Sequence, residues 1–457
     1  MNSSFKNNFT KSRLGSAHYL LMIVFIFSFL FFPSLLSAQL NYDPITINNY
    51  RESRLKKDSL RQNECQQKEL FDLFRKKGKK KKPPKKMLLL ILPKISSNPA
   101  NGFMLGVGST IGWYLGSRET TRVSFIGASV AVTTKNQLLS FIKSNIYTPN
   151  NKLFLQGDWR FYLYNAPTWG VGTNAPDTTF VSESWIWEGA DLTFSDGAYP
   201  MAYDYIKFHE VVNYKLIDNL YVGMGYHFDY FYDIKDEHLD FDTIPFQLTP
   251  HYLYSKYHGF DTAKYMLSGL SLSFFFDSRD NMINPYKGYY VNVNYRVNTT
   301  WLGSDQNSSS LWTEFRTYVS LSRRTPRHLI AFWFYGNFQI SGHQPYLTLM
   351  SIGEDQQGRS GRGYVAGRYR GEDLIYGEIE YRFPISQCSQ IVGGVLFLNF
   401  TTASNRDSGV QLFQYIRPGA GFGFRFMLNK HFRTNLNIEF AYGYKSKGFY
   451  LSGTETF

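Results

Sequence analysis

The sequence predicts an all-β protein: a transmembrane antiparallel β-barrel of 16 strands with a short basic N-terminal tether. Three observations lead to this prediction. From residue 102 onwards, segments of about ten residues alternate between apolar and polar side chains, which places the two kinds on opposite faces of a strand. Aromatic residues make up 18% of the chain and gather at the ends of these segments, as in the girdles of membrane barrels. After the N-terminus, no stretch approaches the roughly 18 apolar residues of a spanning helix.

Residues 1–38 have the layout of a secretion signal. Lys6, Lys11 and Arg13 precede an apolar run over residues 19–32, and the Leu-Ser-Ala sequence at 36–38 offers a small-residue cleavage site. The alternative is a membrane anchor, but the run is short for a bilayer core of about 30 Å. We therefore expect cleavage after residue 38 and export of the mature chain.

Residues 39–86 are predicted to form a periplasmic tether, either helical or disordered. They hold 15 Lys or Arg and 6 Asp or Glu, so they account for +9 of the net charge of +13. The basic run at 75–86 is either a solvated linker or a contact for anionic lipid headgroups. Because the remaining chain is nearly neutral, the charge gives no reason to expect a nucleic-acid partner.

Residues 87–457 are predicted to form the barrel. Within 435–444, apolar and aromatic residues at even positions alternate with Asn, Glu, Ala and Gly, and 152–163 and 291–298 repeat the division. A soluble sandwich is the alternative, because alternation alone also fits a sheet with one wet face. Large charged residues on the polar face, and strands longer than the usual five or six residues or so, favour the barrel.

About fifteen such segments can be counted, ten between Gly102 and Ser341 and five from Asp373 onwards. Since bacterial single-chain barrels have even strand numbers, we expect sixteen and place the missing strand between Thr178 and Tyr203. The long inserts at 165–202 and 235–262 are expected to be extracellular, because periplasmic turns are short. The two cysteines, far apart in the sequence, suggest no disulfide framework.

Two motifs in the second half carry a family resemblance. The first is a segment whose residues are also ordinary turn formers: Asp277, Arg279, Asp280 and Asn281, followed by Pro285 and Gly288. The second is the loop sequence Gly-Arg-Gly-Tyr at 361–364, in a loop over 352–372 that leads into the strand sequence YGEIEYRFP at 376–384. In consistent order over 87–457, these motifs and the final strand, ending on Phe457, resemble the BamA/TamA-type bacterial surface antigen superfamily of Gram-negative outer membranes.

The resemblance implies that the loop folds back into the lumen, with Arg362, Gly363 and Tyr364 as its motif, and that the arginine pairs with acids on the inner wall. A guanidinium in a partly dehydrated lumen needs such acceptors. By alternation, three residues face the lumen and are candidate partners: Glu378, Glu380 and Glu439. The resemblance adds Asn399, which stands where the family commonly has Asp and supplies no charge. The alternative for Arg362 is an ordinary loop arginine facing water. The resemblance also implies a C-terminal assembly signal formed by Phe449, Leu451 and Phe457.

The same resemblance implies a role in inserting or translocating proteins or lipids at the outer membrane. The alternative is a passive channel or structural barrel, because family members that handle clients carry polypeptide-transport-associated domains, and residues 39–86 are too few and too polar for one. The expected partners are outer-membrane lipids, the outer-membrane assembly machinery or a periplasmic protein.

No catalytic motif, metal site or cofactor site stands out in the sequence, so no enzyme activity is expected. His209 and His227 are interpreted as wall residues. The acids Glu378 and Glu380 are expected to partner Arg362 and a group of nearby arginines: Arg368, Arg370 and Arg382.

Overall fold

The computed structural model describes residues 69–70, 88–175, 190–191, 198–243, 246–322, 325–356, 358–386, 388–430, 433–453 and 455–457. No helix in these ranges is long and apolar enough to cross a membrane. The predicted signal peptide and most of the tether lie outside them, so the bounds at residues 38 and 86 stay predictions. Of the tether, only Glu69 and Leu70 are described, and the Glu69 carboxylate accepts a hydrogen bond from the backbone N–H of Lys430 (3.1 Å).

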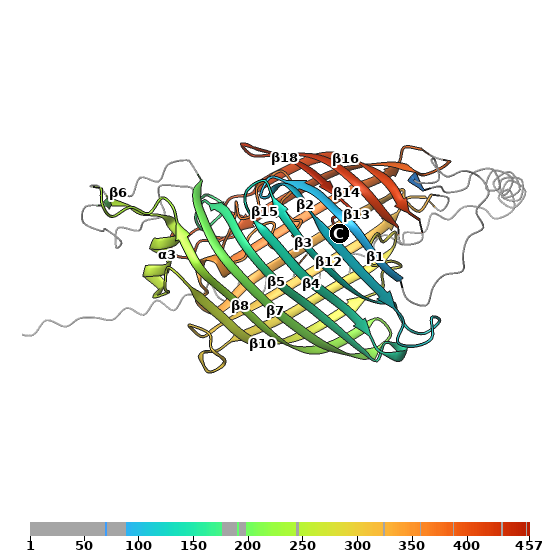
Figure 1. Ribbon diagram of the computed structural model, residues 1–457, viewed down its shortest axis with the longest axis horizontal. Helices are drawn as coiled ribbons and strands as arrows, with labels where there is room; N and C mark the ends of the chain where they lie inside the picture. Colours follow the sequence, from blue (N-terminus) through green and yellow to red (C-terminus); the bar gives the residue numbers. More distant parts are fainter. Residues whose placement is uncertain are drawn as a thin grey trace, which may run out of the picture. The chain divides into compact units, whose positions relative to one another are not determined.

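Sixteen antiparallel strands close into a barrel (Figure 1), which confirms the predicted fold class. Each strand pairs with its neighbour in the chain, and β1 meets β18 to close the ring. The barrel strands are β1 (Leu88–Asn98), β2 (Gly102–Trp113), β3 (Ser124–Thr133), β4 (Leu138–Tyr147), β5 (Leu153–Thr168), β7 (Tyr199–Ile217), β8 (Leu220–Asp236), β10 (Tyr265–Asp277), β11 (Gly288–Asn298), β12 (Ser308–Ser320), β13 (Leu329–Gly342), β14 (Asp373–Pro384), β15 (Val392–Ala403), β16 (Arg417–Asn429), β17 (Thr434–Gly443) and β18 (Ser446–Ser452).

The two faces of the strands differ as the alternation predicts. On β10, Leu272 is 60% exposed on the outside of the barrel, whereas Ser271 and Ser273, on the inside, are buried. On β17, Tyr442 is exposed and Glu439 is buried. An apolar surface of this extent is rare on a protein surrounded by water, so the outer face is suited to lipid.

The missing sixteenth strand is β1, and its predicted position between Thr178 and Tyr203 is wrong. The ten strands counted between 102 and 341 already include β7, which begins at Tyr199. Strand β1 escaped the count because its first five residues, LLLIL, are apolar without a break and Pro93 follows them, so no period of two is visible. Proline is tolerated in edge strands, and β1 borders the closure of the barrel.

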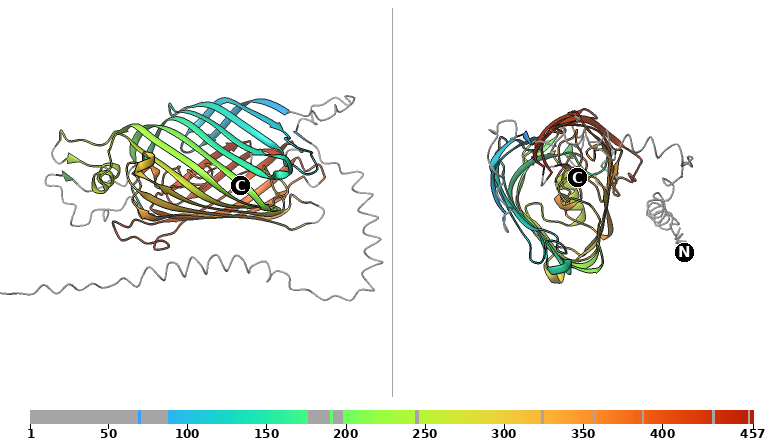
Figure 2. Two further views of the ribbon diagram at one scale, coloured as in Figure 1. Left: turned by 90° about the horizontal axis from the view of Figure 1, so that it is seen from below. Right: turned by 90° about the vertical axis from the view of Figure 1, so that its right-hand side faces the viewer.

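The long loops gather at one end of the barrel and the short turns at the other, as the left view of Figure 2 shows for the first half of the chain. The insert at 235–262 contains helix α3 (Pro250–His258), which starts at Thr249, whose side chain accepts a hydrogen bond from the N–H of Tyr252 (3.2 Å). Strands β6 (Ala190–Asp191) and β9 (Phe246–Gln247) pair separately from the barrel. Buried aromatic residues of α3 and neighbouring loops form a core over this loop end.

Cysteine 388, in the turn between β14 and β15, is disulfide-bonded, contrary to the expectation drawn from cysteine spacing. Cys65, the other cysteine of the sequence, lies outside the described residues.

Candidate functional site

The lumen loop, residues 343–372, connects β13 to β14 and runs from the loop end into the barrel. Its tip carries Arg362 between two glycines. Two glycines shape the tip: Gly361 has φ +74° and Gly363 has φ +103°, conformations that favour glycine. A Cβ on Gly363 would lie 2.9 Å from the carbonyl oxygen of Tyr442. Its N–H donates to the hydroxyl of Tyr450 on β18 (2.9 Å). The loop tip therefore sits directly against β17 and β18.

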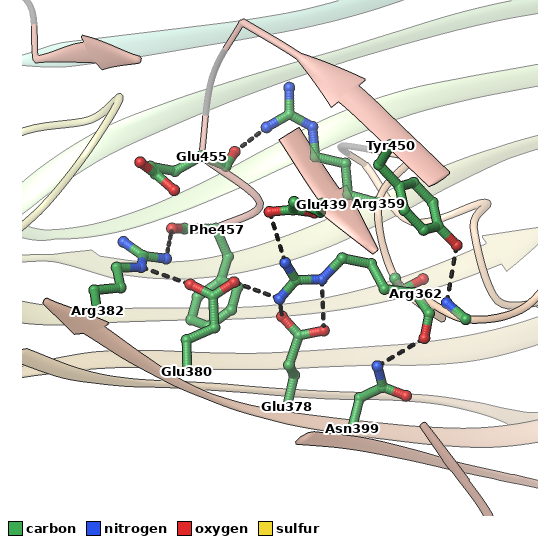
Figure 3. Close-up of polar contacts among 12 residues, drawn as sticks. Arg359, Arg362, Glu378, Glu380, Arg382, Asn399, Glu439, Tyr450, Glu455 and Phe457 are labelled. Atoms are coloured by element: carbon green, nitrogen blue, oxygen red, sulfur yellow. Dashed lines mark hydrogen bonds and ion pairs between the residues drawn. The ribbon is translucent and has the colours of Figure 1, made fainter. Parts of the chain in front are cut away.

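Arg362 is 2% exposed, and its guanidinium is surrounded by acids (Figure 3). It donates to both carboxylate oxygens of Glu378 (2.5 and 3.3 Å) and to Glu439 (2.9 Å), and it also bonds Glu380. The guanidinium stacks on the ring of Phe397, 3.5 Å from the centroid. The structure thus brings Arg362 together with all three predicted glutamates, and the alternative of an arginine facing water is wrong.

Two further arginines complete this cluster. Arg382 bonds the second oxygen of Glu380 (2.5 Å), while Arg425 bonds Glu439 (2.6 Å) and Glu455 (2.8 Å). We call these seven side chains the arginine network: Arg362, Arg382, Arg425, Glu378, Glu380, Glu439 and Glu455. Three guanidinium groups face four carboxylates, so every buried charge has an opposite partner. Removing one partner from such a cluster leaves an uncompensated buried charge.

The remaining residues of the loop motif attach the tip to the barrel wall. Asn399, the fourth predicted partner, donates from its amide nitrogen to the backbone carbonyl of Arg362 (2.9 Å). The hydroxyl of Tyr364 donates to the carbonyl of Pro418 (2.5 Å) and accepts from the N–H of Tyr444 (2.8 Å). Asn399 acts through the loop backbone and contributes no charge, in agreement with its chemistry.

The end of the chain turns into the lumen instead of continuing the last strand. Strand β18 ends at Ser452, so the expectation of a final strand ending on Phe457 is wrong. Phe457 is 4% exposed and packs on Trp333 (ring centroids 5.3 Å apart), and its carbonyl oxygen accepts from Arg382 (3.0 Å). Phe449 points outwards and Leu451 is the partner of Ser97 on β1.

Glu455 gives a physical reason for this turn. Continued alternation would place Glu455 on the outer face, in line with Phe449 and Leu451, where a carboxylate facing lipid is costly. Turned inwards, it accepts from Arg425 and from the amide of Asn435. Burial alone would raise the pKa of Glu455, but the guanidinium groups of Arg425 and Arg382 lower it to about 2.

The predicted turn motif lies between β10 and β11, at the end of the barrel that carries the short turns. Asp277 is fully buried and accepts from the Nε of Arg279 (2.9 Å), while Asp280 accepts from the N–H of Tyr286 (2.9 Å). Asn281 accepts from the backbone of the next residues, Pro285 is buried, and Gly288 has φ +107°, where a Cβ would lie 2.4 Å from a backbone oxygen. These are the contacts of a tightly built turn.

This turn also reaches the end of the chain. Asn284 donates to the carboxylate of Glu455 (3.4 Å), and Asp280 pairs with Arg433 (2.8 Å) in the turn between β16 and β17. Turns from separate parts of the ring therefore meet at the turn end, beside the arginine network.

Sequence reasoning missed Arg425, Glu455 and Tyr450, which contact the network or the loop tip. Alternation placed the strands of Arg425 and Tyr450 correctly, but it does not show which residues meet across a lumen, and it would have put Glu455 on the outer face. Arg368 and Arg370 do not contact Glu378 or Glu380, as had been expected: Arg368 donates to a backbone carbonyl, and Arg370 binds Glu354 (3.1 Å) and three loop carbonyls.

The predicted wall positions of His209 and His227 are confirmed. His209 lies 2.9 Å from the carboxylate of Asp229, and His227 lies 2.7 Å from the hydroxyl of Ser271.

The closure of the barrel is much weaker than any other strand pairing. All 11 residues of β1 pair with β2, from Leu88 opposite Gly112 to Asn98 opposite Gly102. On its other side, β1 pairs with β18 only at Ser97 opposite Leu451. We call this β1–β18 junction the seam. The edge of β1 from Leu88 to Ser96 has no ladder partner there among the described residues.

Comparisons with known proteins agree with this architecture. The Omp85 superfamily domain matches residues 211–457. BamA from Haemophilus ducreyi lacking POTRA domains 1–3 superposes with a TM-score of 0.52 at 13% identity, over 82% of this chain and 71% of that one. CdiB from Acinetobacter baumannii gives 0.48 at 11% identity, over 81% of this chain and 60% of that one. At 13% identity the likeness to BamA concerns the fold. No curated protein sequence matches the chain significantly.

Proposed function

Because the chain belongs to the Omp85 superfamily, we propose that it assists the insertion or translocation of proteins or lipids at the outer membrane by opening the seam between β1 and β18. The family assignment confirms the resemblance drawn from the sequence motifs. The barrel is an integral outer-membrane protein. The proposed role needs no catalytic residue, because opening a strand pair and guiding a client require only binding.

The seam is the observation that carries this proposal. In hydrocarbon, a backbone N–H or C=O without a hydrogen-bond partner costs several kcal/mol. A single hydrogen bond formed in water contributes only about 1 kcal/mol to stability. An unpaired strand edge is also a template for another strand. Since β1 pairs with β18 only at Ser97 and Leu451, this junction can part at lower cost than any complete ladder of the barrel.

The arginine network is suited to stabilising the strands on the β18 side of the seam. It joins the lumen loop to β14 and β17 through Arg362, while Tyr364 and Tyr450 join the loop to β16, β17 and β18. We propose that the loop motif and its partners hold these strands in place when β1 moves away. Phe449 and Leu451, with Phe457, are proposed as the signal that the assembly machinery reads before the chain has folded and Phe457 is buried.

Depletion of the protein tests the function directly. The expected result is lower abundance of other barrel proteins, or of a surface lipid, in the outer-membrane fraction, measured by quantitative proteomics and lipid analysis. Unchanged levels of all of them would contradict the proposal. A steady conductance of the purified barrel in a planar bilayer would instead support the alternative of a passive channel. The loop and the arginine network inside the lumen argue against that alternative.

A disulfide across the seam tests the mechanism. Ser97 and Leu451 are directly opposite, at the Cα separation of about 4.5–5.5 Å that a disulfide accepts. Oxidation of the Ser97→Cys, Leu451→Cys variant is expected to abolish complementation of the depleted strain, and reduction to restore it. The matched control is Val107→Cys, Val130→Cys, which bridges the complete β2–β3 ladder and should leave function unchanged.

The basic tether is proposed to recruit a periplasmic partner that supplies the client-handling domains. A pull-down with the full chain and with a chain lacking residues 75–86 tests this idea. Equal recovery of the same proteins by both chains would rule out that role for the tether.

A further inference from the structure

A second cluster of charges lines the lumen on the first strands of the barrel, apart from the arginine network. It consists of four inward-facing basic residues, which we call the basic wall: Lys94 on β1, Lys143 on β4, Arg160 on β5 and Lys207 on β7. One carboxylate pairs with members of this cluster, that of Asp158, at 2.6 Å from Arg160 and 4.0 Å from Lys207. Two further carboxylates lie near the cluster: Asp355 attracts Lys143, and Asp229 attracts Lys207 but is itself paired with Arg296 at 2.6 Å. With Arg296 counted, five cations in this part of the lumen face three carboxylates.

The arrangement places like charges next to one another. Arg160 and Lys207 are directly opposite on neighbouring strands, a pairing that destabilises a sheet when the charges have the same sign. Lys94 and Lys143 both lie over the ring of Phe141, at 4.7 and 5.5 Å from its centroid. Such an arrangement is unfavourable for the barrel alone and becomes favourable when an anion binds among the cations.

The lumen loop covers part of the basic wall with a neutral group. The backbone carbonyl of Gln356 accepts from Lys143 (2.6 Å) and from Arg160 (3.2 Å). A carbonyl carries only a partial charge, whereas charge-assisted bonds to an anionic oxygen are roughly twice as strong. An anionic oxygen would therefore compete well for this position.

The position of Lys94 indicates where such an anion comes from. Lys94 lies on the part of β1 that has no partner on β18, and its ammonium group points inwards to Ser129 (3.2 Å). Its neighbours Ile91 and Ile95 point outwards and are 62% and 47% exposed. A molecule crossing the seam at this level would meet a cation inside the barrel and apolar side chains outside, the division of an amphiphile.

We propose that the basic wall binds the phosphorylated headgroup of an anionic lipid, which enters from the membrane through the seam while its acyl chains stay against Ile91 and Ile95. Lys94 receives the headgroup at the edge of β1, and Lys143, Arg160 and Lys207 hold it deeper in the lumen. An acidic polypeptide would also satisfy the charges, but it would not use the apolar outer face beside Lys94. The inference rests on the proposed function only for the route through the seam.

Equilibrium binding to the purified full chain in a neutral detergent tests this proposal. Native mass spectrometry would compare a short-chain phosphatidylglycerol, a phosphatidylcholine of equal chain length, inorganic phosphate and an acidic peptide. The expected result is preferential binding of phosphatidylglycerol. Because each lysine adds about 1 kcal/mol to such binding, the Lys94→Gln, Lys207→Gln variant should bind it about 10- to 30-fold more weakly.

Two variants control for charge, and a third tests the route through the seam. Lys447→Gln removes a lysine from the outer face of β18, on the other side of the seam, and should bind like the natural chain. Lys94→Arg keeps the charge and should retain binding, with folding of each variant checked by its heat-dependent electrophoretic mobility. The oxidised Ser97→Cys, Leu451→Cys variant should bind the lipid more slowly if the seam is the route.

Four results would overturn the inference. They are equal binding of the two lipids, equal binding by the natural chain and the Lys94→Gln, Lys207→Gln variant, inorganic phosphate binding as tightly as the lipid, and an acidic peptide binding more tightly than the lipid. Because binding is measured without any client, it can succeed when depletion leaves the outer membrane unchanged, so the failure of the proposed function and the failure of this inference are distinguishable.

Discussion

The two sides of the lumen differ in how their buried charges are satisfied. On β14, β16 and β17, each arginine and glutamate of the arginine network has an opposite charge within bonding distance. On β1, β4, β5 and β7, the cations outnumber the carboxylates near them, Asp158, Asp229 and Asp355. The first side gains stability from its charges, and the second has charges left over for a ligand.

The same division appears in the strand pairing. The network lies beside complete ladders, such as β14 with β15 and β16 with β17, whereas the basic wall begins on β1, beside the seam. A barrel that must open at one place while keeping its circular form needs one side that stays closed. The contrast teaches that the mutually paired charges lie on β14, β16 and β17, whereas the surplus of cations begins at the unpaired edge of β1 and continues on β4, β5 and β7, whose ladders are complete.

Replacing Arg362 by alanine should produce the largest loss of stability. The change leaves Glu378, Glu380 and Glu439 around an empty position, and removing one partner of a buried ion pair costs about 3–5 kcal/mol. Urea unfolding in detergent micelles, followed by tryptophan fluorescence, measures the free energy of unfolding.

Arg406→Ala is the matched control for that change. Its side chain is 45% exposed and pairs with Asp373, and exposed ion pairs contribute about 0–1 kcal/mol. Equal losses in the two variants would mean that the arginine network is no more important than a surface ion pair.

The pH dependence of stability should reveal Glu455. Its pKa is lowered to about 2 in the folded chain from an ordinary value of 4.5, so its contribution is present above pH 4.5 and is lost as the pH falls towards 2. A separation of that size corresponds to about 3 kcal/mol. Unfolding free energies measured from pH 6 to pH 2 should fall in the natural chain, and the fall should be smaller in Glu455→Gln.

An unchanged acid slope in Glu455→Gln would show that other carboxylates dominate acid unfolding. Glu119→Gln, in an exposed turn, serves as the control and should keep the slope of the natural chain.

Replacing Tyr364 by phenylalanine should have a smaller effect. The change keeps the ring but removes the hydroxyl that bonds Pro418 and Tyr444, and leaving these partners unpaired costs about 1–3 kcal/mol. Limited proteolysis should then cut the lumen loop faster than in the natural chain. Equal cleavage rates in both chains would mean that the hydroxyl does not hold the loop.

The features that could be predicted from the sequence are those that depend on the local pattern of a strand or on a motif. Alternation gave the inward position of Glu378, Glu380 and Glu439, and the loop motif identified Arg362 as their partner. Strand β1 was missed because LLLIL has no alternation to read. The inward turn of Phe457 and the bond between Arg425 and Glu455 depend on which residues meet across a closed ring, and no single strand records that information.

Replacing Lys207 by glutamine should have the smallest effect on stability, and its sign should be opposite to that of Arg362→Ala. Lys207 faces Arg160 directly, and relieving such a like-charge pair stabilises a sheet by about 0.2–1 kcal/mol. The change leaves Asp158 with its 2.6 Å bond to Arg160, so no buried charge loses its partner. The free energy of unfolding in urea should stay equal or rise slightly. A loss comparable to that of Arg362→Ala would show that the basic wall is as fully compensated as the arginine network, and the contrast between the two sides would fail.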